Sequence, residues 1–181
     1  MTTHAPAKPL SKATYPDATT LRIERVLPGP IERVFEYLTD EKLSAKWLGA
    51  IRMEPRVGGK VEIRFDHRNL TSEAPPERFK DCSDLATGRV TRFDPPRGLS
   101  FTWTEVSDTS EVSFDLSPRG PDVLLVLVHR GVVKRDTRVS VSGGWDTHLA
   151  VLEDLLRGGP VRPFWATFMA REAEYQQVIP R

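Results

Sequence analysis

The chain has 181 residues, of which 39% are hydrophobic and 28% are charged, a composition typical of an ordinary globular domain. Its 26 Lys and Arg residues nearly balance its 25 Asp and Glu residues, so the formal net charge is +1. Without a basic surplus the protein lacks the counterion-release effect that drives general nucleic-acid binding, and we expect no nucleic-acid partner.

Cysteine content and the N-terminal sequence bear on metal binding and on the cellular compartment. Cys82 is the single cysteine, which excludes an intrachain disulfide and a cysteine-based metal cluster. The four histidines show no spacing typical of a metal site, so we expect neither a metal nor another cofactor. Residues 1–17 contain no apolar stretch of the signal-peptide type, and no apolar run approaches the ~18 residues of a membrane span. We therefore expect a cytoplasmic protein without a membrane partner.

A tail, one strand and two short helices are expected in the first part of the chain. Residues 1–18 are rich in Thr, Ala and Pro without periodicity, which predicts a disordered tail. Residues 21–26 alternate apolar and charged side chains, as a half-buried strand does. Apolar residues at helical spacing predict a short helix over 31–38, and Asp40 is placed to cap a second one that carries Trp47.

Six more strands are expected in the middle of the chain, because short apolar or alternating runs are separated by turn residues. They cover residues 51–54, 61–65, 87–93, 99–106, 112–116 and 122–129. Polar residues and two prolines over 66–85 predict a long loop, which we expect to act as a mobile lid or edge cover. Consecutive strands joined by short turns pair antiparallel, and a sheet of this size curls around whatever covers its concave face.

Two helices are expected near the C-terminus. A polar connector over 134–142 precedes Gly143-Gly144, and the helix that follows places one apolar stripe on a single face: Trp145, Leu149, Leu152 and Leu156. This helix is the only expected element that is long and apolar enough to cover the sheet. A last helix is expected over about 163–178. The predicted fold class is therefore α+β, a curved antiparallel sheet of about six or seven strands around a long C-terminal helix.

Several short phrases run through the chain from about residue 21 to 159. They are Ile23-Glu24-Arg25, residues 30–35, Leu38-Thr39-Asp40, Trp47-Leu48-Gly49, residues 55–59, Gly88-Arg89-Val90, Asp94-Pro95-Pro96, Phe101-Thr102-Trp103, His129 and Gly144-Trp145. In this order they resemble the Aha1-like family (activator of heat-shock-protein ATPase, C-terminal domain) of the START-like, or SRPBCC, superfamily. The resemblance implies a helix-grip domain over residues 19–160, preceded by the tail and followed by a helical extension over 161–181.

The resemblance also implies three classes of function. In this superfamily the space between sheet and helix binds lipids, hormones or polyketide-like molecules, and a few members are cyclases or hydrolases. In the eukaryotic co-chaperone a similar domain works beside a separate module that drives chaperone binding. Fold alone does not choose among these classes.

The candidate site rests on which side chains share the concave face. His129 has the same strand parity as Leu125 and Leu127, and His148 follows Trp145 by three residues on the helix. Each histidine is either a hydrogen-bonded interior residue, or a polar anchor in a pocket or a general acid or base. The aromatic residues are either plain core or the wall of a pocket. The candidate ligand-binding residues are Trp47, Phe65, Phe101, Trp103, Phe114, His129, Trp145, His148 and Leu149.

The first hypothesis is a binding protein for an apolar or aromatic small molecule, held between the sheet and the C-terminal helix. The second is a docking module for a chaperone or another protein partner. The third is a cyclase or hydrolase that uses His129 with an acid, although no catalytic residue is assigned. The sequence leaves monomer and homodimer open.

Overall fold

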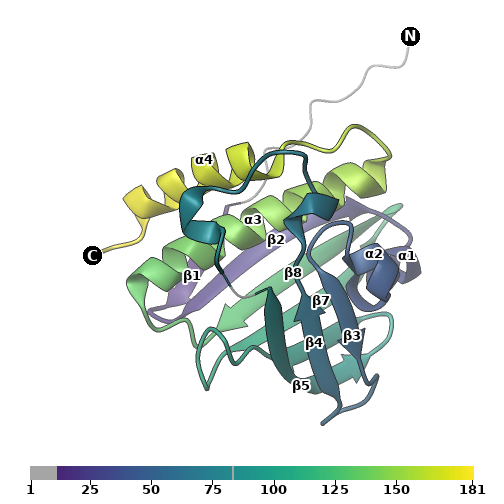
Figure 1. Ribbon diagram of the computed structural model, residues 1–181. Coiled ribbons are helices and arrows are strands. Elements are labelled where there is room, and N and C mark those ends of the chain that lie inside the picture. Colours follow the sequence, from purple (N-terminus) through teal and green to yellow (C-terminus); the bar gives the residue numbers. More distant parts are fainter. Residues whose placement is uncertain (1–11, 83) are drawn as a thin grey trace.

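An eight-stranded antiparallel sheet curves around a long helix in the computed structural model, which describes residues 12–82 and 84–181 (Figure 1). The strands are β1 (Thr14–Asp17), β2 (Thr20–Pro28), β3 (Ala50–Met53), β4 (Lys60–Arg64), β5 (Leu85–Asp94), β6 (Gly98–Thr102), β7 (Glu111–Arg119) and β8 (Asp122–Arg130). The helices are α1 (Ile31–Thr39), α2 (Glu41–Ser44), α3 (Arg135–Arg157) and α4 (Phe164–Val178), with short 3₁₀ turns η1 (His67–Asn69) and η2 (Glu77–Phe79).

The order of strands across the sheet is β1-β2-β8-β7-β6-β5-β4-β3, and every neighbouring pair is antiparallel. The predicted α+β helix-grip class is confirmed. β8 lies inside the sheet, as its apolar sequence predicts, and Leu125, Leu127 and His129 all point to the buried side. The apolar stripe of α3 packs on this side, where Leu149 and Leu152 have no exposed surface.

The sheet has one strand more than expected, because the N-terminal segment pairs with β2. Thr14 lies opposite Arg22, and Asp17 lies opposite Thr20. The hydroxyl of Tyr15 in β1 also donates to Oγ of Ser142 in α3 at 2.8 Å. The predicted tail over residues 1–18 is therefore wrong at its C-terminal end, while residues 1–11 lie outside the described residues.

The long helix begins earlier than expected. α3 starts at Arg135, so the expected polar connector over 134–142 is mostly helical and Gly143-Gly144 lies inside the helix. Glycine at 143 is explained by packing, since a Cβ atom there would lie 3.2 Å from Cα of Glu172 in α4. The glycine pair lowers the helix propensity but lets α4 lie directly against α3 (Figure 1).

A buried ionic cluster joins the sheet to both long helices. Arg25 in β2 donates to Asp146 in α3 at 2.8 Å, and both side chains are 2% exposed. The hydroxyl of Tyr175 in α4 donates to the other carboxylate oxygen of Asp146 at 2.7 Å and accepts from the backbone N–H of Ala13 at 2.9 Å. Burial lowers the pKa of Arg25 and raises the pKa of Tyr175. One carboxylate thus fixes the positions of β2, α3 and α4.

We predict that Asp146→Ala lowers the free energy of unfolding by about 3 to 5 kcal/mol, because it leaves the Arg25 charge buried without its main partner. Urea unfolding measures the loss. Asp84→Ala is the matched control: its side chain is 68% exposed and lies 4.0 Å from Arg64, so its removal should cost less than about 1 kcal/mol. Equal losses in the two variants would contradict this description of the cluster.

Candidate ligand-binding site

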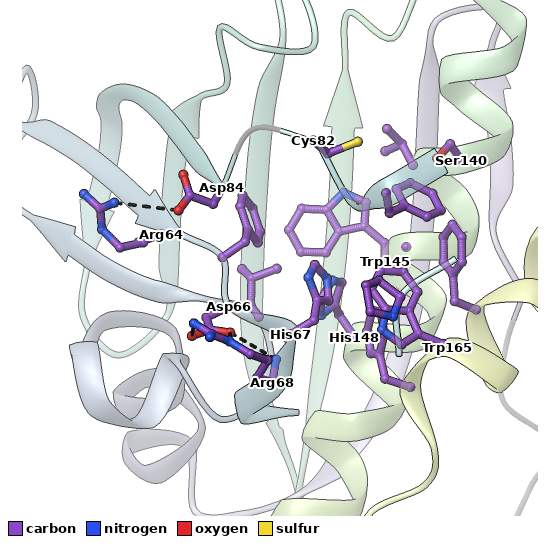
Figure 2. Close-up of a pocket in the computed structure, with 18 of the residues that line it drawn as sticks. Arg64, Asp66, His67, Arg68, Cys82, Asp84, Ser140, Trp145, His148 and Trp165 are labelled. Carbon is purple, nitrogen blue, oxygen red and sulfur yellow. Dashed lines mark hydrogen bonds and ion pairs between the residues drawn. The ribbon is translucent and has the colours of Figure 1, made fainter. Parts of the chain in front are cut away.

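A pocket of about 700 Å³ lies between the sheet, α3, α4 and the segment that joins β4 to β5 (Figure 2). Its volume is in the range of pockets that hold small organic molecules. Its wall includes a large aromatic cluster, with side chains from four different parts of the chain: Phe65, Phe79, Trp103, Trp145, Phe164, Trp165 and Phe168. The described residues contain no group of three His, Cys, Asp or Glu that could hold a metal ion.

The structure brings five of the nine predicted site residues to this pocket: Phe65, Trp103, His129, Trp145 and His148. The other four lie in the hydrophobic core and do not line it: Trp47, Phe101, Phe114 and Leu149.

Two of the core residues support the pocket wall from behind. The ring of Phe101 is 6.3 Å from that of Trp103, and the ring of Phe114 is 5.8 Å from that of Trp145. β6 ends at Thr102, earlier than the predicted strand over 99–106, so Trp103 leaves the sheet and turns toward the pocket. Strand parity therefore predicts that these residues share one face of the sheet, but it does not predict which part of that face lines the pocket.

Several pocket residues were not predicted, and they belong to α4 and to the segment between β4 and β5. They are His67, Phe79, Phe164, Trp165 and Phe168, with Ser140, Val141 and Gly144 from the part of α3 that was expected to be a connector or a helix start. Two aromatic residues four positions apart, Phe164 and Phe168, indicate an apolar face on α4. Nothing local in the sequence indicates which surface that face covers.

The segment between β4 and β5 lies beside α4 (Figure 1), and several of its residues line the pocket. The carboxylate of Glu73 accepts two backbone N–H groups in the first turn of α4, at 2.9 and 3.1 Å. Such a carboxylate is stabilised by the positive end of the helix dipole. Arg78 forms an ion pair with Glu172, and Phe79 stacks on Trp165 with ring centroids 5.3 Å apart. The segment thus has the position of a lid, and its mobility stays a prediction.

His129 reaches the pocket wall with both ring nitrogens already engaged. The indole N–H of Trp145 can only donate, so its 3.0 Å contact makes Nδ1 of His129 an acceptor. The proton of the neutral ring is therefore on Nε2, which donates to Oγ of Ser110 at 2.7 Å. Burial lowers the pKa of His129 to about 3. The ring stacks with that of Trp103 at 5.8 Å, and neither of its nitrogens is free to bind a ligand.

His148 has a different arrangement, because one of its nitrogens remains open to the pocket. Its Nδ1 lies 2.6 Å from the carbonyl oxygen of Trp47, which can only accept, so Nδ1 carries the proton. Burial, with a smaller effect of the nearby His67, lowers the pKa of His148 to about 3. Burial also lowers the pKa of His67, whose ring centroid is 6.0 Å away. Two neutral imidazoles therefore lie together in the pocket.

Two ion pairs lie along one side of the aromatic cluster. Figure 2 shows the pairs Arg64–Asp84 and Arg68–Asp66 beside the aromatic cluster, with N···O distances of 4.0 and 2.8 Å. The hydrogen bond from Arg68 lowers the pKa of Asp66. Each of these cations has a carboxylate partner, so the mouth of the pocket is polar but carries little net charge.

The fold and the pocket together define the class of protein. An antiparallel sheet that curves around a C-terminal helix, with a pocket between them, is the helix-grip architecture of the START-like superfamily. Residues 28–157 match the family described as Activator of Hsp90 ATPase homolog 1-like protein, and the chain belongs to this family. The resemblance seen in the sequence is confirmed. No curated protein matches the chain.

Solved structures of similar proteins match this chain over most of its length. The protein encoded by gene BPP1335 of Bordetella parapertussis is 37% identical, with a TM-score of 0.78, and the match covers 98% of this chain and 96% of that one. The crystal structure of CalU16 from Micromonospora echinospora is 23% identical, with a TM-score of 0.66 and coverage of 90% and 89%. The Aha1 dimer of Colwellia psychrerythraea is 17% identical, with a TM-score of 0.60 and coverage of 76% and 95%. The last two show the fold alone.

This family and fold are those of a ligand-binding or docking module. No helix within the described residues combines the length and the apolar composition needed to cross a membrane.

We predict that the free energy of unfolding decreases as the pH falls from about 6.5 to about 5. Both histidines take up a proton near pH 6.5 in the unfolded chain, whereas His129 and His148 stay neutral to about pH 3 when folded. Their stabilisation is complete above pH 6.5 and is lost as the pH falls toward 3, by about 1.4 kcal/mol per pH unit for each histidine. Urea unfolding at several pH values measures the slope. His129→Gln should reduce the slope by about 1.4 kcal/mol per pH unit, which is the contribution of one proton. An unchanged slope would show that His129 is not buried.

Proposed function

We propose that this protein binds an apolar, aromatic small molecule in the pocket between the sheet, α3 and α4. The observation that carries the proposal is the pocket of about 700 Å³ itself, with a cluster of seven Phe and Trp side chains in its wall. A filled interior would favour a docking role, whereas an open apolar pocket with a few polar groups is the usual form of a ligand site.

The wall favours flat, unsaturated ligands over flexible ones. Trp103 meets the ring of Trp145 edge-on at 5.5 Å and stacks with Phe65 at 5.8 Å, so a planar ring added to this set finds both faces and edges to contact. A two-ring ligand that buries about 250 Å² of apolar surface gains roughly 6 kcal/mol before the costs of association. Because the costs of association reduce this gain, we expect a Kd between about 100 μM and 1 mM for a bare two-ring probe.

Protein docking is supported less well than ligand binding. The large apolar side chains with the most exposed surface lie on different parts of the chain: Val57, Val133, Val161, Met169 and Val178. Single exposed apolar residues of this kind are common on protein surfaces and do not mark an interface.

Catalysis by His129 also has little support. A general base needs a free nitrogen within hydrogen-bond reach of the substrate. Both nitrogens of His129 are held by Ser110 and Trp145. A base at this position would have to break one of these buried hydrogen bonds first.

Filling the pocket tests the proposal without damaging the fold. Gly144 lines the pocket from within α3, and a Cβ atom there meets no atom within 4 Å. Leucine has a higher helix propensity than glycine, so Gly144→Leu should keep or raise the free energy of unfolding, by up to about 1 kcal/mol. It should also weaken binding of 1-naphthol at least tenfold in isothermal titration calorimetry.

The control for this experiment is Ala166→Leu, which adds a similar side chain at an exposed position of α4 outside the pocket. This variant should bind 1-naphthol like the parent protein. If Gly144→Leu binds the probe as tightly as the parent, the ligand site is elsewhere and the proposal fails.

The lid position of the segment between β4 and β5 leads to a kinetic prediction. Glu73→Gln weakens the attachment of the segment to α4, so association and dissociation of 1-naphthol should both become several-fold faster, as measured by stopped-flow quenching of tryptophan emission. Glu77→Gln is the control, because Glu77 is 86% exposed on the same segment. Unchanged rates in Glu73→Gln would mean that ligands enter by another route.

A further inference from the structure

The pocket contains a hydrogen-bond acceptor that the protein itself leaves unused. Because Nδ1 of His148 donates to the carbonyl of Trp47, Nε2 of the neutral ring has a free lone pair. Within residues 12–82 and 84–181, no group hydrogen bonds to this nitrogen. His148 is 7% exposed and lines the pocket, and its unpaired Nε2 retains accessible surface, so a molecule in the pocket can reach this acceptor.

A second unused polar group lies in the same wall. The indole N–H of Trp165 is buried and has no acceptor among the described residues. Leaving a buried donor or acceptor unpaired costs about 1 to 3 kcal/mol, and such groups in folded proteins call for an explanation. Because this indole N–H retains almost no accessible surface, the group that a ligand can partner directly is the reachable Nε2 of His148.

The surroundings of His148 restrict what that partner can be. Phe164 lies 4.7 Å from the His148 ring and 5.0 Å from Trp165, so the open nitrogen is flanked by aromatic surface. The titratable groups that line this part of the pocket are His67, Asp66 and Glu73. Glu73 is held at the start of α4 and Asp66 is paired with Arg68. The cations that line the pocket are Arg64, Arg68 and Lys80, and each has a carboxylate partner. An anionic ligand therefore finds no unpaired cation among them, whereas a neutral donor meets a ready acceptor.

We propose that the pocket selects an aromatic molecule with a hydroxyl group, whose O–H donates to Nε2 of His148 while its ring lies against the aromatic wall. This inference rests on the proposed function and defines its ligand class. A phenol-type hydroxyl is neutral at pH 7, carries the required donor and is continuous with a flat apolar ring.

Two probes of nearly equal shape test the hydroxyl. Calorimetric Kd values are measured for 1-naphthol and 1-methylnaphthalene with the parent protein and with His148→Phe. In the parent the ratio of the methylnaphthalene Kd to the naphthol Kd should be about tenfold higher than in His148→Phe, because only the parent has the acceptor. His67→Phe is the control and should keep the parent ratio, since His67 is adjacent to His148 but is not the proposed acceptor.

A measurement on the parent protein tests the same hydrogen bond even if His148→Phe does not fold. The ¹⁵N resonance of the His148 Nε2 atom should move on addition of 1-naphthol and stay in place on addition of 1-methylnaphthalene. If neither probe binds, both the hydroxyl proposal and the proposed function fail. Binding of both probes with the same Kd ratio in parent and His148→Phe would overturn only the hydroxyl proposal. Tighter binding of 1-naphthoate than of 1-naphthol, increasing from pH 8 to pH 6, would overturn it in favour of an acid ligand.

Discussion

The buried ion pair between Arg25 and Asp146 is the interaction on which the geometry of the pocket depends. A buried charge is tolerated only when nearby partners compensate it. The Asp146 carboxylate has two such partners, because it accepts hydrogen bonds from Arg25 in β2 and from Tyr175 in α4. These contacts fix α3 against the sheet and α4 against α3. Because α4 supplies Phe164, Trp165 and Phe168 to the pocket wall, a charged cluster outside the pocket determines where that wall stands.

The two adjacent glycines of α3 show how one helix serves both packing and an open site. Gly143 lets α4 approach to within contact of the α3 backbone, whereas Gly144, one position further, leaves free space on the pocket side. The next residue, Trp145, then spans from the helix to His129 on the sheet. The pocket is therefore bounded by large side chains and kept open, on the α3 side, by the missing side chain of Gly144.

Periodicity in the sequence predicted seven of the eight strands, the stripe of α3 and the inward face of β8, because burial of alternate residues leaves a local pattern. It failed at the start of α3, since a glycine pair usually marks a helix end and its packing role depends on Glu172, about 30 residues further on. Five of nine site residues reach the pocket, while Trp47, Phe101, Phe114 and Leu149 are core. Local patterns report which side chains are buried, but the separation of core from pocket depends on contacts with α4 and the β4–β5 segment.

The four tryptophans provide the most direct test of the account, because three line the pocket and the fourth, Trp47, does not. The indole N–H of Trp47 is held by the carbonyl of Tyr37 at 2.8 Å in the core. In a ¹⁵N-correlated NMR titration with 1-naphthol, the indole signals of Trp103, Trp145 and Trp165 should shift in proportion to occupancy while that of Trp47 stays in place. Indole signals that do not respond, or four signals that shift alike, would contradict a ligand site in this pocket.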